Sequence, residues 1–469
     1  MRLLAGFLLI ASCKGNVSSH GDAASDPLVD ADPDAPDAAP PLPACEAPGQ
    51  ATFTVTQEVV ASHFVGYGGQ MNNNLYAAIS AAKGVTPENV VDAEDKVVAL
   101  APDHVRIFWD PDGTADNTQS FERVAELAQR AGATINVTWW HGPYPDPDVQ
   151  MKAFADELAH LIQDRQIDAV RAITIQNEVN STSIPQPLYE ELYRSLDAHL
   201  RAAGLRDHIA FVCGDLVRDG QLSWLQYMAA NMADVCDAYS THIYWDYDDT
   251  AKPVDRLTEV RGIVDALPAA GRKPLEVTEF GIRGDTAPGE AQPGRYSDGE
   301  LLGRTNENAF QHAWFNILAM RLGYVSVLKW DVYFAMYDDT EQYYGMIGIP
   351  PDWFLKPVYF ASQAFTRTTE PGWDIARVSG EQSAGLVSAL VGPRGDTTVF
   401  ALNKDYGARK FAVTGLPPGV PLHVIVWHGE DGGDGGLSET EMVSSDDCKI
   451  SFIVPKRSFA AVTTLDPGL

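Results

Sequence analysis

Between about residue 60 and residue 367, short apolar segments alternate with segments whose apolar residues recur at helical spacing. The apolar segments are mostly rich in Val, Ile, Phe and Trp with little polar alternation, as is typical of parallel strands buried on both faces. Eight strands are predicted in this way: His63–Gly66, His104–Trp109, Thr134–Trp140, Ala169–Gln176, His208–Cys213, Ala238–Tyr244, Pro274–Phe280 and Val325–Val332.

The segments between these strands carry the marks of amphipathic helices. Thr86-Pro87 begins one helix, with proline in the first turn and Ala93, Val97 and Val98 on one face. Two more helices are indicated by Phe154, Leu158, Leu161 and Ile162, and by Tyr189, Leu192, Tyr193, Leu196 and Leu200. Eight alternations of strand and helix predict an α/β fold, the (β/α)8 or TIM barrel. A doubly wound sheet is the alternative, but Gly66-Tyr67-Gly68-Gly69 lacks the spacing of its phosphate-binding turn.

After about residue 370 the pattern changes to short alternating runs separated by Gly, Pro and Asp turns. These runs are Val387–Val391, Thr397–Asn403, Lys410–Val413, His423–His428, Lys449–Val454 and Phe459–Thr464. They predict an antiparallel β-sandwich domain over residues 370–469, after a catalytic barrel at 60–367. The run Ala51–Val60 also alternates, and we expect it to add a strand to this sandwich.

The N-terminal 44 residues are predicted to export and tether the protein. In residues 1–12, Arg2 precedes the apolar run Leu3–Ile10, which is shorter than the ~20 residues of a membrane-spanning helix. The run ends in Ile10-Ala11-Ser12-Cys13, which resembles the lipobox of bacterial lipoproteins and implies that Cys13 is lipidated. An ordinary secretory signal is the alternative. Residues 13–44 are rich in Asp, Ala and Pro and predict a disordered tether. We therefore expect a secreted protein that is lipid-anchored to the bacterial outer membrane or cell surface.

The net charge limits the binding partners to be expected, and the cysteine content limits the possible disulfides and metal sites. The formal net charge of −30 argues against nucleic acid or an anionic membrane surface as a partner. If Cys13 is lipidated, Cys45, Cys213, Cys236 and Cys448 allow three pairings, of which Cys45–Cys448 is plausible in an oxidising compartment. We expect Cys213 and Cys236 not to pair, because they are predicted towards opposite ends of neighbouring strands. The absence of a CxxC motif or a Cys/His cluster indicates no structural metal.

Two predicted strands end in glutamates. The fourth strand, within AITIQNEVN, ends in Asn177-Glu178, and the seventh, within PLEVTEFGI, ends in Glu279. Reactive side chains of a (β/α)8 barrel lie at the carboxyl ends of its strands, so both carboxylates are expected to face one cleft. Cleavage of a glycosidic bond needs such a pair, one protonated and the other ionised.

With these segments, QNE and TEFG, the sequence resembles clan A of the glycoside hydrolases over about residues 60–367. The resemblance implies that Glu178 is the acid/base, that Asn177 binds the sugar 2-hydroxyl and that Glu279 is the nucleophile. The C-terminal sandwich is similar to the accessory domain that many members carry.

Further strand ends fit the same resemblance. The family has an arginine beside the nucleophile, which implies this position for Arg106, and its charge would keep Glu279 ionised. His242 and Tyr244 match a His-x-Tyr pair that hydrogen-bonds the nucleophile and the sugar in many members, and Trp330 is implied as the sugar platform. His141 also follows a predicted strand. For His141 and His242, a structural role and a contact with substrate both stay open.

The predicted reaction is retaining hydrolysis of β-linked oligo- or polysaccharides by a monomer without cofactor or metal. The two carboxyl groups are then expected about 5–5.5 Å apart. One alternative is a catalytically inactive surface protein that binds carbohydrate on the same barrel. A second is a metal-dependent barrel hydrolase, which would need several His and Asp at strand ends, for instance an HxH motif after the first strand. The chain has only 11 histidines and no such motif. The sugar, its linkage, and endo or exo action stay open.

Overall fold

The computed structural model of the protein describes residues 51–110, 114–140, 142, 144–217, 222–285, 301–333, 344–348, 353–380, 385–429, 436–444 and 448–468. The predicted signal, the tether, Cys13 and Cys45 lie in residues 1–50, outside the described residues.

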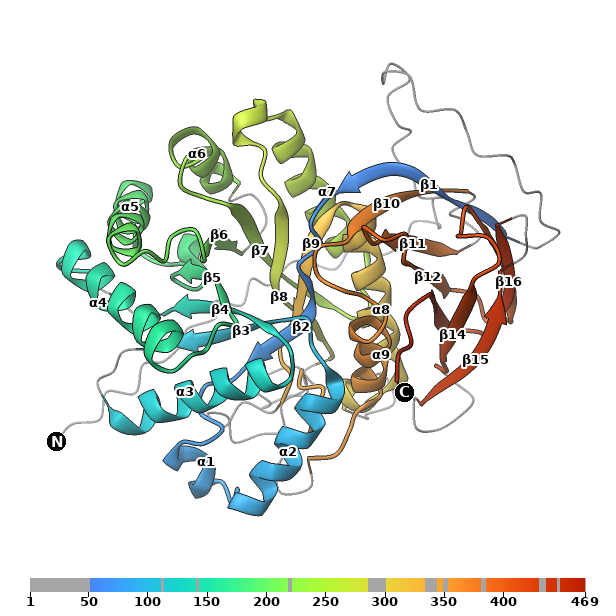
Figure 1. Ribbon diagram of the computed structural model, residues 1–469, viewed down its shortest axis with the longest axis horizontal. Coiled ribbons are helices and arrows are strands. Elements are labelled where there is room, and N and C mark those ends of the chain that lie inside the picture. Colours follow the sequence, from blue (N-terminus) through green and yellow to red (C-terminus); the bar gives the residue numbers. More distant parts are fainter. Residues whose placement is uncertain are drawn as a thin grey trace. The chain divides into compact units, whose positions relative to one another are not determined.

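The predicted barrel is present. Eight parallel strands, β2 to β9 in order, form a closed barrel (Figure 1). They are β2 (Gly66–Met71), β3 (His104–Trp109), β4 (Thr134–Trp139), β5 (Val170–Ile175), β6 (Ala210–Leu216), β7 (Ala238–Asp246), β8 (Leu275–Arg283) and β9 (Tyr324–Lys329). Because this sheet closes on itself, the doubly wound alternative is wrong.

The first strand of the barrel was misplaced by sequence. It runs from Gly66 to Met71, not over His63–Gly66. Its glycines allow close approach of neighbouring strands: a Cβ at Gly68 would lie 1.9 Å from the carbonyl oxygen of His104. Glycine has low strand propensity, so the sequence GYGGQM hides a buried strand.

The strands alternate with helices as expected. The α-helices are α1 (Ala78–Ala82), α2 (Pro87–Leu100), α3 (Ala115–Arg130), α4 (Pro147–Ala159), α5 (Gln186–Ala202), α6 (Ser223–Asn231), α7 (Ala251–Ala266), α8 (Asn306–Arg321) and α9 (Pro357–Thr366). A π-helical turn, η1 (His160–Asp164), extends α4, and three short 3-10 helices are η2 (Val179–Ser181), η3 (Ala269–Gly271) and η4 (Leu302–Arg304). Thr86 caps α2 through a capping box with Asn89. Ala93 and Val97 are buried in α2, whereas Val98 is 38% exposed, contrary to its predicted face.

A second sheet of nine strands accompanies the barrel. Its order is β15-β14-β17-β12-β11-β10-β1-β13-β16. The strands are β1 (Ala51–Ala61), β10 (Asp374–Gly380), β11 (Leu386–Val391), β12 (Thr397–Asn403), β13 (Arg409–Thr414), β14 (Pro421–Trp427), β15 (Leu437–Val443), β16 (Lys449–Val454) and β17 (Ser458–Thr463). Adjacent strands pair antiparallel except β1 and β13, which are parallel. The C-terminal sheet is thus the mostly antiparallel sandwich-like unit that the alternating runs predict, and β1 lies within it.

Aromatic packing joins this sheet to the barrel helices. Phe365 of α9 stacks on Phe400 of β12 and Phe459 of β17, with ring centroids 4.5 and 5.1 Å apart. These rings belong to the same apolar core as the outer face of the barrel strands. Burial of large aromatic rings contributes much of the free energy of packing between a sheet and its covering helices. The sheet is therefore fixed against α8 and α9.

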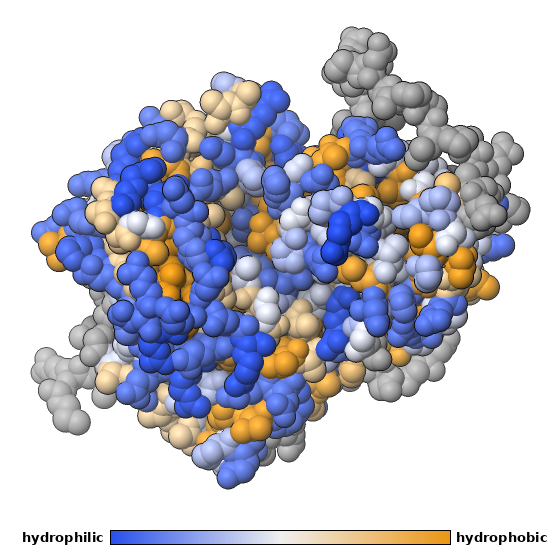
Figure 2. Space-filling model, in the orientation of Figure 1, coloured by the Kyte–Doolittle hydropathy of each residue, from blue (hydrophilic) through white to orange (hydrophobic). Residues whose placement is uncertain are grey.

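Hydrophilic side chains cover most of the face shown in Figure 2, and hydrophobic ones form small groups. The largest apolar side chains, among them Trp139, Trp245 and Trp353, are instead buried. Within the described ranges, every helix is too short or too polar to cross a bilayer.

The cysteines pair differently from the expectation. Cys213 and Cys236 form a disulfide, with their Cα atoms 5.8 Å apart. The prediction that they stay apart was wrong because Cys236 precedes β7 by only two residues, while Cys213 lies opposite Tyr239, the second residue of β7. Cys448 is a free thiol among the described residues, and the suggested Cys45–Cys448 bridge involves a residue outside them.

Candidate active site

Glu279 lies in the wall of the barrel and is held by two donors. Its side chain is 8% exposed. Arg106 Nη1 donates to Oε2 at 2.8 Å, and the Tyr244 hydroxyl donates to Oε1 at 2.6 Å. A register shift in β8 between Val277 and Phe280 allows consecutive residues, Thr278 and Glu279, both to reach polar partners inside the barrel. The local irregularity of β8 is therefore what aims Glu279 at Arg106 and Tyr244.

Arg106 is the centre of the buried hydrogen-bond network. It comes from β3 and has no exposed surface. Its five N–H groups meet five oxygens: Thr138 Oγ1 at 2.9 Å, Gln70 Oε1 at 3.3 Å, Glu279 Oε2 at 2.8 Å, Asn177 Oδ1 at 2.7 Å and Asp215 Oδ2 at 2.6 Å. A guanidinium has five donors in a rigid fork, so complete pairing fixes its position and compensates its burial. The position expected for Arg106 beside Glu279 is the one observed.

Glu178 is presented on an unusual backbone. It follows β5, and both it and Gln176 have positive φ angles, 50° and 66°. Non-glycine residues adopt this left-handed region at a cost of about 1–3 kcal/mol, and such residues cluster at functional sites. Asn177 between them accepts from Arg106 through Oδ1, which orients its amide nitrogen away from the guanidinium. In contrast with Glu279, the Glu178 side chain is 32% exposed.

His242 connects the two glutamates. Its side chain in β7 has no exposed surface, and Nδ1 lies 3.4 Å from Glu178 Oε1 and 3.8 Å from Glu279 Oε2. Burial by itself lowers the pKa of His242, but the charges of Glu279 and Asp215 outweigh it and raise this pKa to about 9. The imidazole is therefore a cation at neutral pH.

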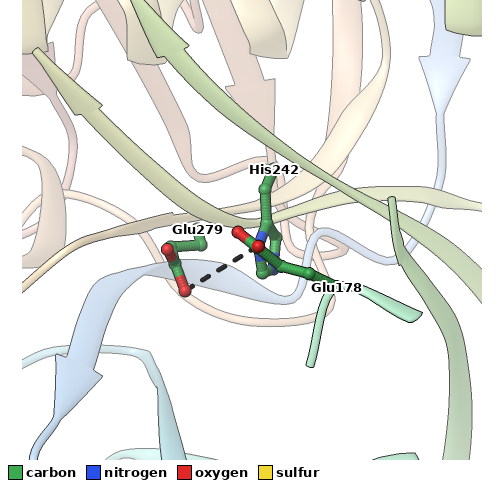
Figure 3. Close-up of side chains that lie close together, drawn as sticks. All are labelled: Glu178, His242 and Glu279. Carbon is green, nitrogen blue, oxygen red and sulfur yellow. Dashed lines mark hydrogen bonds and ion pairs between the residues drawn. The ribbon is translucent and has the colours of Figure 1, made fainter. Parts of the chain in front are cut away.

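The two carboxylates are close to one another. One oxygen of Glu178, one oxygen of Glu279 and one nitrogen of His242 all lie within 4.8 Å of each other. Figure 3 shows the two glutamates converging beside the His242 ring. Three such atoms are also a conceivable ligand set for a cation. However, both Glu279 oxygens already accept hydrogen bonds and the Arg106 cation is in contact, so the surroundings suit a hydrogen-bonded carboxylate better than a metal ligand.

Tyr244 depends on a neighbouring glycine. Burial and the nearby Glu279 charge raise the pKa of Tyr244 well above its usual value, so its hydroxyl remains a donor. Its ring packs edge-on against Tyr344 with centroids 5.5 Å apart. A Cβ at Gly281 would lie 2.5 Å from Tyr244 and 2.8 Å from Tyr344. The glycine of the TEFG segment thus leaves space for the tyrosine that holds Glu279.

Aromatic side chains form one wall beside Arg106, whose guanidinium carbon lies 4.4 Å from the Phe108 ring centroid. Phe108 contacts both Trp140 and Trp330, with centroids 5.1 and 6.0 Å apart. Trp140 is 45% exposed and Trp330 is partly exposed, so both offer ring surface to a ligand. Trp139, by contrast, is 2% exposed and packs in the core, so of these two adjacent tryptophans Trp140 faces outward. His141 lies outside the described residues.

Four site neighbours were missed by sequence: Gln70, Phe108, Thr138 and Asp215. Gln70, Phe108 and Thr138 lie within strands rather than at predicted ends. Asp215 was missed because the fifth strand is predicted to end at Cys213, whereas β6 continues to Leu216 and contains Asp215. A carboxylate two residues beyond the predicted end of a barrel strand is the one available signal.

Comparison with known proteins finds solved structures with a similar fold. No protein-family model and no curated protein matches the chain. A family 30 endoxylanase from Clostridium papyrosolvens has a TM-score of 0.62 at 12% identity, covering 88% of this chain and 100% of its own. An α-L-arabinofuranosidase from Thermotoga maritima has 0.64 at 13%, over 89% and 100%. An endo-β1,6-glucanase has 0.61 at 14%, over 90% and 96%. At these identities the likeness is one of fold, and it spans the barrel together with the C-terminal sheet.

Proposed function

We propose that this protein is a retaining glycoside hydrolase that cleaves β-linked oligo- or polysaccharides with Glu279 as nucleophile and Glu178 as acid/base. The observation that carries the proposal is that one oxygen of Glu178, after β5, and one oxygen of Glu279, in β8, lie within 4.8 Å of each other. Retaining enzymes hold the pair about 5–5.5 Å apart, whereas inverting enzymes need about 6.5–9.5 Å to admit a water. The fold shared with solved glycoside hydrolases supports the same reaction class.

The surroundings of the two glutamates support their different roles. Glu279 is buried and accepts from Arg106 and Tyr244, so it is held in one place for attack. Glu178 is partly exposed, and a leaving group or a water molecule can reach it. In the first step a Glu279 oxygen bonds to the anomeric carbon while Glu178 gives its proton to the departing glycosidic oxygen. In the second step Glu178 takes a proton from water, whose oxygen displaces Glu279 and releases the sugar with net retention.

The aromatic wall supports a carbohydrate as the substrate. The C–H faces of a pyranose pack on aromatic rings, and Trp140 and Trp330 expose such faces around Phe108, whose ring lies against Arg106. Asn177, held by Arg106, has its amide nitrogen left to donate to a sugar hydroxyl.

A screen of chromogenic β-glycosides together with plant, fungal and algal polysaccharides tests the proposal. The wild type is compared with Glu279→Ala and with Glu276→Gln, a buried control on the same strand. We expect activity on at least one glycan, a loss of about 10⁴-fold or more in Glu279→Ala, and no loss in Glu276→Gln. Wild-type rates in Glu279→Ala would show that the nucleophile is assigned wrongly. Binding without hydrolysis, unchanged in Glu178→Gln, would favour an inactive carbohydrate-binding barrel.

A further inference from the structure

Asp215 is a fully buried carboxylate that sequence gave no reason to place in the site. It lies near the end of β6 with a φ of 50°, directly after Gly214, whose φ is 133°. The pairing of β6 with β7 shifts register between Cys213 and Leu216. A side chain at Gly214 would lie 2.6 Å from the carbonyl oxygen of Ser240, so this irregular backbone requires glycine. Its result is to turn the Asp215 side chain into the barrel.

Both oxygens of Asp215 are engaged on all sides. Oδ2 accepts from Arg106 Nη2 at 2.6 Å. Oδ1 accepts from the Ser240 hydroxyl at 2.8 Å and from the Thr278 hydroxyl at 2.5 Å. The Asp215 backbone N–H in turn donates to Ser240 Oγ at 2.7 Å. A buried carboxylate with this many donors is fixed in position and charge.

Asp215 also lies behind both cations of the site. His242 Nε2 is 3.4 Å from Asp215 Oδ1, while Nδ1 on the other side of the ring faces the two glutamates. Arg106 likewise contacts Asp215 through Nη2 and Glu279 through Nη1. Burial would raise the pKa of Asp215, but Arg106 and His242 hold it well below its usual range. The buried Asp215 carboxylate therefore lies against both Arg106 and His242, the two groups that lie against the glutamate pair.

We propose that Asp215 is a positioning residue of the glycosidase site: it holds Arg106 and His242 against Glu279 and Glu178 without touching substrate itself. This inference rests on the proposed function. Without the Asp215 carboxylate, Arg106 loses one of its five partners and His242 loses the anion behind Nε2. Two cations would then be buried with only the reacting glutamates as counter-ions, and both would be drawn towards them.

Two substitutions separate charge from geometry. Asp215→Asn keeps an oxygen for Arg106 and removes the negative charge, whereas Asp215→Ala removes the contact as well. Glu276→Gln is the matched control, because it removes another buried carboxyl of the barrel. Burial, with help from the charge of Asp215, raises the pKa of Glu276 to about 8, so this group is already neutral at pH 7. If Asp215→Ala fails to fold, Ser240→Ala and Thr278→Val each remove one hydroxyl donor to Oδ1 instead.

The readout is covalent labelling by dinitrophenyl 2-deoxy-2-fluoro-β-glycosides, followed by intact-protein mass spectrometry, with kcat/KM on the parent dinitrophenyl glycosides. We expect Asp215→Asn to slow labelling and lower kcat/KM by about 10²-fold and Asp215→Ala by about 10³-fold, with full final labelling. Ser240→Ala and Thr278→Val should each lose about 10-fold, since each deletes one hydrogen bond to a charged group. Glu276→Gln should match the wild type.

A rate loss with full final labelling supports positioning, because a merely structural defect lowers the labelled fraction instead. Wild-type rates in Asp215→Asn and Asp215→Ala, or losses explained by a lower labelled fraction, would overturn the inference.

Crystal structures of the wild type and of Asp215→Ala provide a readout that does not need activity. The inference predicts that the 2.8 Å contact of Arg106 with Glu279 and the 3.4 Å approach of His242 to Glu178 change in the variant. If the wild type is neither active nor labelled, the proposed function fails and the inference on Asp215 fails with it. If the wild type is active and these contacts do not move in Asp215→Ala, the inference alone is overturned.

Discussion

The barrel presents two glutamates of the same chemistry in opposite surroundings. Glu279 is buried in β8 between two donors and is 8% exposed. Glu178 follows β5 on a left-handed backbone, is 32% exposed, and has His242 at 3.4 Å. The difference teaches that the role of a carboxylate is set by what holds it: strong donors fix one in place, and access to solvent leaves the other free to exchange protons with a leaving group and water.

The sharpest way to break this comparison is Glu178→Gln assayed with two leaving groups. Because the variant cannot protonate the leaving group, kcat/KM for a glycoside with a poor leaving group such as methoxide should fall about 10²–10⁴-fold. Dinitrophenolate departs without a proton, so kcat/KM for its glycoside should fall much less. Glu191→Gln, an exposed glutamate of α5, is the control. Equal losses for both leaving groups would mean that Glu178 is not the acid.

Tyr244→Phe tests the hold on Glu279. The variant deletes the 2.6 Å hydrogen bond to Oε1, and a bond to a charged group contributes about 1.5–3 kcal/mol. We expect kcat/KM to fall about 10- to 100-fold, measured on the best aryl glycoside, while the fold is retained. Tyr239→Phe on the same strand loses only a bond to the Gly271 carbonyl oxygen and should keep full activity. An unaffected Tyr244→Phe would show that Glu279 does not need this donor.

His242 joins the two regions, and its charge predicts a pH dependence. Its pKa is about 9 in the folded protein and 6.5 for the free side chain, so the folded state binds the proton more tightly. The resulting stabilisation, about 3 kcal/mol, is fully present below pH 6.5 and is lost as pH rises through 9. Urea unfolding of wild type and His242→Gln across this range measures it. The difference in unfolding free energy should shrink with rising pH; a constant difference would mean that His242 is neutral.

The smallest effect is expected on the open side of the site. Trp140→Ala removes a ring that is 45% exposed and contacts Phe108, so it should raise KM about 3- to 10-fold with little change in kcat. Tyr406, between β12 and β13, is 80% exposed; Tyr406→Ala is the control and should change neither constant. Unchanged KM in Trp140→Ala would place the substrate elsewhere on the barrel rim.

Sequence patterns located the parts of this fold that follow from local chemistry. The predicted strand His104–Trp109 has the observed bounds, and Thr134–Trp140 is one residue too long. These strands are continuous apolar runs with clear ends. The strand Gly66–Met71 was misplaced because its glycines are required by the close approach of neighbouring strands. A local sequence pattern does not reveal such contacts.

The candidate site likewise contains residues that local sequence patterns predict and residues whose positions depend on tertiary packing. Glu178 follows one recognisable strand and Glu279 lies in another, so their proximity could be expected from the barrel alone. Asp215 could not, because Gly214-Asp215 has the composition of a turn and its inward direction depends on a register shift against β7. The orientation of Trp139 and Trp140 likewise depends on packing around Phe154 and Phe108 rather than on the two adjacent letters of the sequence.

Proton NMR of the first product formed from the best β-linked substrate tests the central claim most directly. If Glu279 forms a covalent intermediate and Glu178 activates the water, the β-anomer appears first and the α-anomer grows in later by mutarotation. An α-anomer appearing first would show inversion, and would contradict the assignment of these two glutamates as nucleophile and acid/base.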